Sequence, residues 1–121
     1  MAPVIEVAKL IKDFDWLDTV YTGLLPEEVK SDDQQTIGLI TETRNAPATY
    51  GGNSFWDLSI GVQIEVFFAE DFTQDMTMIS VDLMKLLEKS GWRIENSRPL
   101  MIDPDTNQLI KVWVVGKLKE I

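Results

Sequence analysis

Residues 58–68 carry the pattern that most constrains the fold, because apolar side chains occupy every second position. The even positions hold Leu58, Ile60, Val62, Ile64, Val66 and Phe68. The odd positions 59–65 hold serine, glycine, glutamine and glutamate. Successive side chains of a β-strand point to opposite faces of the sheet, so this period of two predicts a strand with one buried face. We expect its other face to meet solvent or a partner.

Two segments show helical spacing instead. Residues 3–14 begin with a proline that suits a first helical turn, and apolar side chains follow at intervals of three or four. A second helix is expected to be capped by Asp71 or Thr73 and to end at Gly91. Its predicted buried stripe consists of Met76, Ile79, Leu83, Leu86 and Leu87. Val81 and Met84 lie outside that stripe, which predicts that this helix contacts two surfaces.

The remaining segments complete a sheet. They are predicted to be a short strand over 19–25, a polar loop over 30–35, a strand over 35–43, and a hairpin with arms 92–102 and 109–118 around a turn at 103–107. Both faces of the last arm are apolar near Trp113, so we expect both to be covered. This order predicts one α+β domain over residues 1–121, with a mixed or antiparallel central sheet and two helices packed on one face.

Composition excludes several kinds of chemistry. The chain has no Cys and no His, which removes disulfides, thiolate nucleophiles, Cys-based zinc sites and the Ser-His-Asp triad. It carries 20 Asp and Glu against 11 Lys and Arg, a net charge of −9 that does not favour binding to DNA or to an anionic membrane. Residues 1–4 do not resemble the start of a signal peptide, so we expect a cytosolic origin.

The acidic residues are interpreted as surface and turn residues, with no cofactor and no metal expected. Asp103, Asp105 and Asn107 match the opening of a calcium-binding EF-hand loop, but Gln108 and Val114 stand where that motif needs glycine and glutamate. A hairpin turn accounts for all three. Acidic clusters at 13–18 and 70–75 have the composition of solvated surface. We therefore do not expect an enzyme, although a small carboxylate-dependent hydrolase is kept as an alternative.

Residues 43–57 show no period and are predicted to form a long loop. The segment is rich in aromatic residues, which disordered chains lack and protein contacts favour. Its two glycines favour a flexible or tight turn. Arg44 and Tyr50 are predicted contact residues, whereas Phe55 and Trp56 fit a contact and a folded-back core position equally well. The predicted interaction residues of the whole chain are Arg44, Tyr50, Asn53, Phe55, Trp56, Val81, Met84 and Trp113.

Several short motifs resemble those of one family. They are residues 50–55 (YGGNSF), 61–68 (GVQIEVFF), Gly91-Trp92, 97–99 (SRP) and 102–112 (IDPDTNQLIKV). They resemble the tail terminator, or tail completion, proteins of long-tailed siphophages and of prophages in Gram-positive bacteria. The resemblance implies an α+β fold and a hexameric ring on the head-proximal end of the tail tube. The ring stops tube polymerisation and provides the surface that joins the head connector. It implies no catalytic residues.

A ring of this kind sets the expected partners and location. The partners are other copies of the chain, the major tail tube protein and the head–tail connector protein, with DNA only passing through the lumen. Six copies at −9 each would total −54, and we expect negative charge to face the channel and let DNA slide. The expected location is the host cytoplasm during assembly and then the virion tail. A different neck or head–tail joining adaptor, and an acidic binding module unrelated to phages, remain alternatives.

Overall fold

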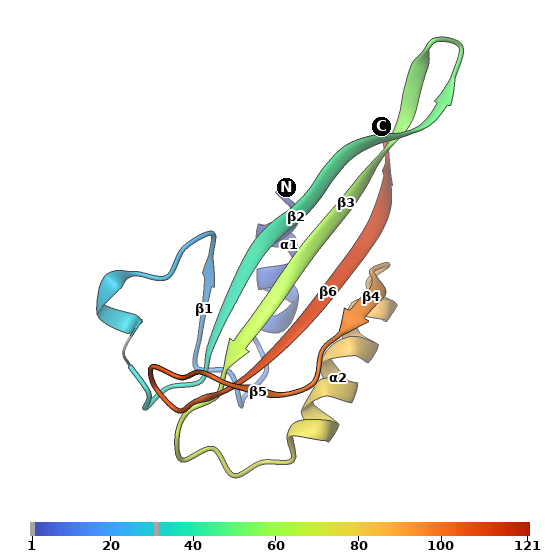
Figure 1. Ribbon diagram of the computed structural model, residues 1–121. Helices are drawn as coiled ribbons and strands as arrows, with labels where there is room; N and C mark the ends of the chain where they lie inside the picture. The colour runs from blue at the N-terminus through green and yellow to red at the C-terminus, as the bar shows by residue number, and fades with distance from the viewer. Residues whose placement is uncertain (1, 31) are drawn as a thin grey trace.

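A six-stranded mixed sheet with two helices on one face forms the protein (Figure 1), in a computed structural model that describes residues 2–30 and 32–121. The helices are α1 (Pro3–Ile11) and α2 (Met76–Lys89), with a short 3₁₀ helix, η1, at Glu27–Val29. The strands are β1 (Thr19–Thr22), β2 (Ile37–Gly51), β3 (Ser54–Phe67), β4 (Arg93–Ser97), β5 (Met101–Ile102) and β6 (Leu109–Glu120). The predicted α+β class is confirmed. Met1 and Ser31, the latter within the predicted polar loop, lie outside the described residues.

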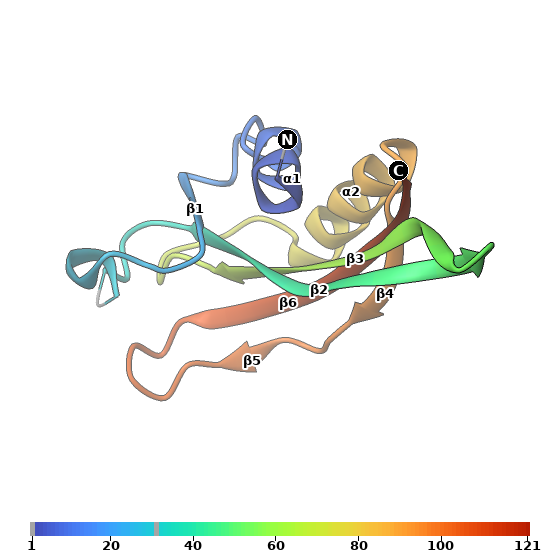
Figure 2. The ribbon, with the colours of Figure 1, turned by 90° about the horizontal axis from the view of Figure 1, so that it is seen from above.

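The sheet has the strand order β1-β2-β3-β6-β4, and β5 also pairs with β6. The pair β1–β2 is parallel, and the other pairs are antiparallel. Seen from above, both helices lie on the same side of the sheet (Figure 2). Burying one face of a sheet beneath helices is the usual solution for an α+β domain.

The core lies between the helices and the alternating residues of β3. Ile60, Val62, Ile64 and Val66 are all buried, so the predicted buried face is confirmed. The helices and β6 cover them with Val7, Ile11, Ile79, Leu83, Leu87, Trp113 and Val115. Trp16 and Leu17, which follow α1, are buried in the same cluster.

The ends of α2 differ in how well the sequence predicted them. Asp75 caps the helix by accepting hydrogen bonds from the backbone N–H groups of Thr77 and Met78, so the prediction of Asp71 or Thr73 was wrong. The helix therefore begins later than predicted, and among the residues before it Phe72 packs against Phe68, with their ring centroids 4.8 Å apart. At the other end Gly91 has a φ of 92°, which confirms its predicted left-handed conformation.

The largest departure from prediction concerns residues 43–57, which form the end of a hairpin and not a loop. β2 continues to Gly51 and β3 begins at Ser54. Between them Gly52 and Asn53 have φ values of 59° and 68°, as a two-residue type I′ turn requires. The tight-turn interpretation of the glycines is thus confirmed. The sequence did not predict these strands, because no core covers them here. Apolar and polar side chains therefore do not alternate along them.

The C-terminal hairpin also forms, but its first arm is broken. Predicted as one strand over 92–102, it is divided into β4 and β5 by residues 98–100, and a bulge interrupts β4 between Ile94 and Asn96. The predicted turn at 103–107 is confirmed. Asn107 donates its backbone N–H to the Asp103 carbonyl at 2.8 Å, and the Asp103 side chain accepts from the Asp105 N–H at 2.9 Å.

Candidate interaction surfaces

The tip of the β2–β3 hairpin projects beyond the rest of the molecule (Figure 1), and we call residues 45–56 the arm. The third strand, β6, stops pairing with β3 at the pair Asp57 and Glu120. Every residue of the arm is exposed or half-buried. The arm therefore adds backbone pairing to the fold but places no side chain in the core.

Three aromatic side chains of the arm are open to solvent. Tyr50 is 72% exposed, Trp56 57% and Phe55 38%. Tyr50 and Phe55 pack edge to face with centroids 6.3 Å apart, and the Trp56 indole N–H donates to the Gly51 carbonyl at 3.1 Å. These contacts hold the rings on the arm itself, so the alternative that Phe55 and Trp56 fold back onto the core is wrong. Clustered, exposed aromatic side chains are typical of protein-binding surfaces.

The arm also lacks charge. No Asp, Glu, Lys or Arg occurs between residues 45 and 56, although such residues make up 26% of the chain. The next exposed apolar side chains, Leu118 and Ile121, lie at the end of β6, where the Ile121 N–H donates to the Trp56 carbonyl at 3.1 Å. Leu118 and Ile121 thus extend the apolar surface of the arm, although the charged residues Asp57, Lys119 and Glu120 lie beside them.

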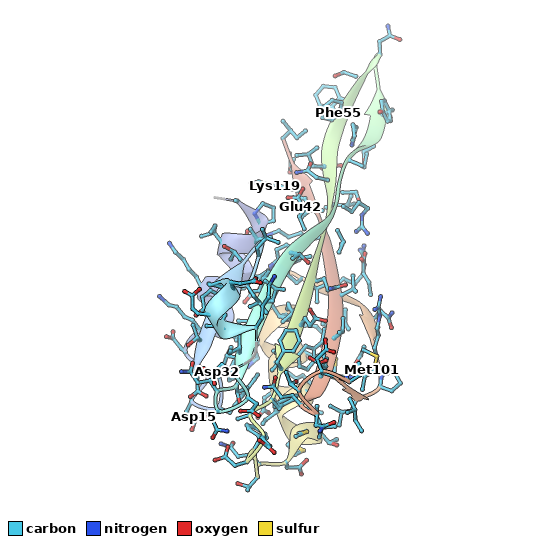
Figure 3. All side chains as sticks on the ribbon, turned by 60° about the vertical axis from the view of Figure 1, so that its left-hand side comes forward. Asp15, Asp32, Glu42, Phe55, Met101 and Lys119 are labelled. Atoms are coloured by element: carbon cyan, nitrogen blue, oxygen red, sulfur yellow. The ribbon has the colours of Figure 1, made fainter. Side chains whose placement is uncertain are left out.

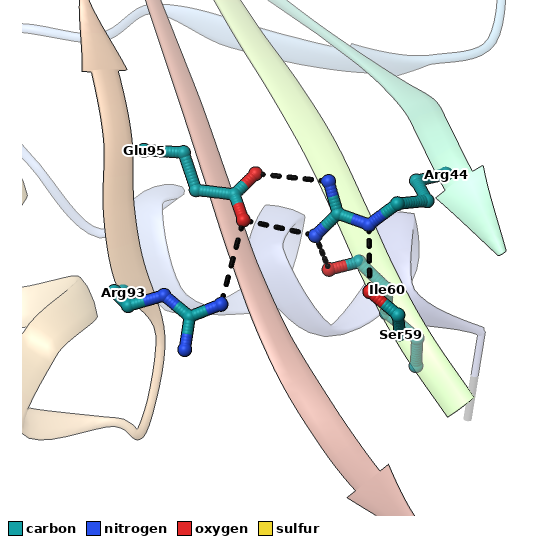
Figure 4. A network of polar contacts seen from close by, with 5 residues as sticks. All are labelled: Arg44, Ser59, Ile60, Arg93 and Glu95. Carbon is teal, nitrogen blue, oxygen red and sulfur yellow. Dashed lines mark hydrogen bonds and ion pairs between the residues drawn. The ribbon is translucent and has the colours of Figure 1, made fainter. Parts of the chain in front are cut away.

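An ion pair crosses the sheet at the root of the arm (Figure 4). Arg44 on β2 reaches over β3 and β6 to Glu95 on β4, with its two terminal nitrogens 3.1 and 2.9 Å from the carboxylate oxygens. The Arg44 Nε donates to the Ser59 hydroxyl at 2.7 Å, and a terminal nitrogen donates to the Ile60 carbonyl at 3.2 Å. Arg93 adds a weaker contact to Glu95 at 3.6 Å. We call the pair Arg44–Glu95 the clamp.

Two glycines make room for the clamp. Gly61 and Gly116 face each other across β3 and β6. A Cβ atom on Gly116 would lie 2.5 Å from a Glu95 carboxylate oxygen, and one on Gly61 would lie 2.6 Å from the Thr43 hydroxyl and 3.2 Å from Arg44. The clamp can lie flat on the sheet only because both positions lack a side chain.

The clamp changes the interpretation of Arg44. Its side chain is 35% exposed and serves an intramolecular ion pair, so the prediction that it lies on an exposed loop was wrong. Bidentate hydrogen bonding from Arg44 lowers the pKa of Glu95 below its ordinary value, and the carboxylate raises the pKa of Arg44. Both shifts favour the charged forms, so the clamp persists at neutral pH.

A second apolar surface lies beside α2. A groove of about 300 Å³ is lined by Phe68, Met76, Thr77, Ser80, Val81, Met84, Leu100 and Lys111. Val81 and Met84, which sequence placed outside the buried stripe of α2, both line it. Among the residues that the structure describes, Lys111 is the one charged residue of this lining, and partial burial lowers its pKa. Leu100, which lines the groove, is followed in the chain by Met101 and Ile102, and these three residues expose between 44% and 65% of their surface.

Two predicted interaction residues have other roles. Trp113 is fully buried, and its indole N–H donates to the Ser80 hydroxyl at 2.9 Å, so its placement on a contact surface was wrong. Helix α2 covers the face of β6 that carries Trp113, whereas Val112, which is also buried, points to the opposite face. Asn53 is exposed at the tip of the arm, where its positive φ serves the turn. Sequence reasoning missed Glu95, Leu100 and Met101, because the distant partner of Arg44 and the edge position of β5 have no local signal.

One family model matches residues 1–120, and its description reads "Protein of unknown function (DUF806)". The chain belongs to the DUF806 family. No curated protein matches the sequence. Within residues 2–30 and 32–121, this DUF806 protein has no helix that is long and apolar enough to cross a membrane. The same residues contain no group of three acidic, His or Cys side chains placed to hold a metal ion.

The two apolar surfaces of the DUF806 protein are far apart. Phe55 on the arm and Met101 beside the groove lie towards opposite ends of the molecule (Figure 3). Lys111, at the groove, and Glu120, at the root of the arm, belong to the same strand, β6. At a rise of about 3.4 Å per residue, they are separated by roughly 30 Å. The arm of one molecule therefore cannot cover the groove of the same molecule.

Proposed function

We propose that this DUF806 protein is a structural component of a phage tail, a terminator that forms a ring on the head-proximal end of the tail tube. The ring stops tube polymerisation and offers the surface for head joining. One observation carries most weight beside the motif resemblance, namely the two different apolar surfaces at opposite ends of the molecule. A closed ring needs two different patches on each subunit, because its contacts are head to tail.

The motifs that resemble tail terminators fall on structurally demanding positions. Residues 50–55 form the turn of the arm, and residues 61–68 begin with the glycine beneath the clamp. Gly91-Trp92 ends α2, and residues 102–112 form the turn that joins β5 to β6. These positions include the turn of the arm, one of the two glycines beneath the clamp and two lining residues of the groove, Phe68 and Lys111. They support a role that depends on shape and contact surfaces, and they include no cluster suited to catalysis.

Charge limits how such copies can associate. Each subunit carries −9, and salt screens that repulsion only beyond about 8 Å at physiological ionic strength. Close contact is therefore expected through surfaces without acidic residues, namely the uncharged arm and the groove, whose lining has Lys111 as its charged residue. The acidic residues remain for the outer surface and the lumen, where negative charge would repel the phosphates of passing DNA.

Deleting the gene from a phage that carries it tests the proposal. Loss of a terminator should give tails of uncontrolled length, measured by electron microscopy of lysates, and expression of the wild-type chain in trans should restore a single length. Tails of normal length that fail to attach to heads would instead support the alternative of a neck or head–tail adaptor. Normal, infectious particles would contradict both roles.

A further inference from the structure

We propose that the arm of one copy seats in the α2 groove of the next copy. This inference rests on the proposed ring and names the contact that would build it. Tyr50, Phe55 and Trp56 of one subunit would lie against Val81, Met84 and Leu100 of its neighbour. Each copy then gives one arm and receives one, so the contact repeats around the ring with the same polarity.

The groove suits an aromatic occupant. Its lining is mostly apolar, and its volume of about 300 Å³ has room for an aromatic side chain. Buried aromatic rings remove large apolar areas from water, about 150–250 Å² each. Lys111 provides a cation beside the lining and already lies 5.7 Å from the centroid of the Trp113 ring. A ring from a neighbour could lie against the same cation.

Charge favours a second copy as the occupant. Any contact between two molecules of this chain must avoid setting acid against acid, since each copy carries −9. The arm has no charged residue from 45 to 56, and the groove has a single charged lining residue, the cation Lys111. A strongly basic partner would find no acidic residue on the arm and would meet the cation Lys111 in the groove, so it would be drawn to the acidic surfaces elsewhere.

The arm is also organised before it binds. The type I′ turn, the edge-to-face pair of Tyr50 and Phe55, and the Trp56–Gly51 hydrogen bond fix its tip. The clamp ties its root to the far edge of the sheet. A surface that is ordered beforehand loses less entropy on association, so a small contact can suffice when six are closed into one ring.

Thiol cross-linking tests the contact directly, because the chain has no cysteine of its own. Ser54→Cys marks the arm and Thr77→Cys marks the groove, and both positions are exposed. A short bis-maleimide should convert this double variant into a ladder of covalent multimers on a denaturing gel. The matched control joins Ser54→Cys to Leu24→Cys, whose position is 85% exposed and follows β1 at the other edge of the sheet.

A mixing experiment then tests the polarity of the contact. Trp56→Glu damages only the arm, and Val81→Glu damages only the groove, so each variant alone should oligomerise at least 10-fold more weakly than the wild type in native mass spectrometry. An equimolar mixture retains one intact arm and one intact groove per pair. The mixture should therefore form heterodimers, whereas each variant alone forms few dimers of its own. Circular dichroism should show that both variants are folded.

The outcomes separate this contact from the proposed function. A double variant that cross-links no better than its control, or a mixture without heterodimers, overturns the arm-in-groove contact. If tails still lose length control on gene deletion, the terminator role stands and the ring is built by other surfaces. If the ladder and heterodimers form but deletion leaves tail length normal, the contact stands and the terminator role is wrong.

Discussion

The β2–β3 hairpin passes through two environments, and its two halves behave differently. Near the helices Ile40 and Ile64 are fully buried, whereas on the arm Tyr50 is 72% exposed although the same two strands are still paired. Backbone pairing continues from one half to the other, so the difference lies in what covers the side chains. The buried half contributes its side chains to the core, whereas the arm leaves its aromatic side chains exposed.

A β-bulge and the clamp lie at the boundary between the two halves of the hairpin. A bulge between Glu42 and Arg44 shifts the register of β2 shortly after its last buried residue, Ile40. The bulge is followed at once by the clamp, which spans the sheet from Arg44 to Glu95. Bulges bend and twist a strand, so this one changes the direction of the hairpin as it leaves the helices. The clamp then fixes that direction against the far edge of the sheet.

The largest expected effect compares a charge placed in each half. Ile64→Asp puts an unpaired carboxylate among buried apolar side chains, and we expect it to lower the free energy of unfolding by about 4 kcal/mol or more. The matched variant Trp56→Asp should change it by less than about 1 kcal/mol, since that residue lies on the exposed arm. Urea denaturation followed by circular dichroism measures both. Similar losses in the two variants would show that the arm is part of the cooperative core.

The next largest expected effect on stability concerns Gly116, which lies beneath the clamp. Gly116→Ala places a methyl group against Glu95 and Arg44, and we expect a loss of about 1–2 kcal/mol as the ion pair is displaced. In a Glu95→Ala background the methyl group has less to displace, so the same substitution should cost clearly less. A double-mutant cycle from denaturation curves measures this coupling. Additive losses would mean that the glycine serves the strands and not the clamp.

Much of the body of this protein could be predicted from sequence, because its signals are local and periodic. The alternation of residues 58–68, the apolar stripe of α2 and the glycine at 91 each follow from a packing or backbone requirement that neighbouring residues share. The class and the single covered face followed from those elements. Trp113 was wrongly predicted to lie on a contact surface. An apolar strand face has the same sequence pattern whether a helix of the same chain or a partner protein covers it.

The candidate site was harder to predict, because its features depend on distant residues or on the absence of packing. Arg44 and Glu95 are 51 positions apart, and no local pattern joins them. The strands of the arm lose their alternation once no helix covers them. The turn itself could have been predicted, since Gly-Asn between two extended segments is typical of a β-hairpin. That turn would have predicted the arm.

A smaller effect should appear as a pH dependence of the clamp. The pKa of Glu95 is lowered by Arg44, so the ion pair stabilises the fold above the ordinary carboxyl pKa, about 4.3, and this stabilisation is lost as the pH falls through the lowered value. We expect Glu95→Gln to cost about 1 kcal/mol at pH 7. The cost should shrink as the pH falls below about 4. Denaturation curves of both proteins across this range measure it, and Glu28→Gln, at an exposed position of η1, is the control. A cost that does not vary with pH would contradict an ionic role for Glu95.

The smallest effect comes from one backbone angle in the arm. Thr49 has a φ of 56°, a left-handed conformation that a β-branched residue adopts only with strain, whereas asparagine tolerates it. Thr49→Asn should therefore stabilise the protein by about 0.5 kcal/mol, a rise in melting temperature of roughly 2–3 °C. Thr22→Asn at the exposed end of β1, where φ is not positive, should give no gain. If Thr49→Asn instead lowers the melting temperature as a core variant would, Thr49 contributes packing that its exposure does not reveal. A rise confined to Thr49→Asn would show that the arm holds Thr49 in a strained backbone conformation, which the pairing of its two strands maintains.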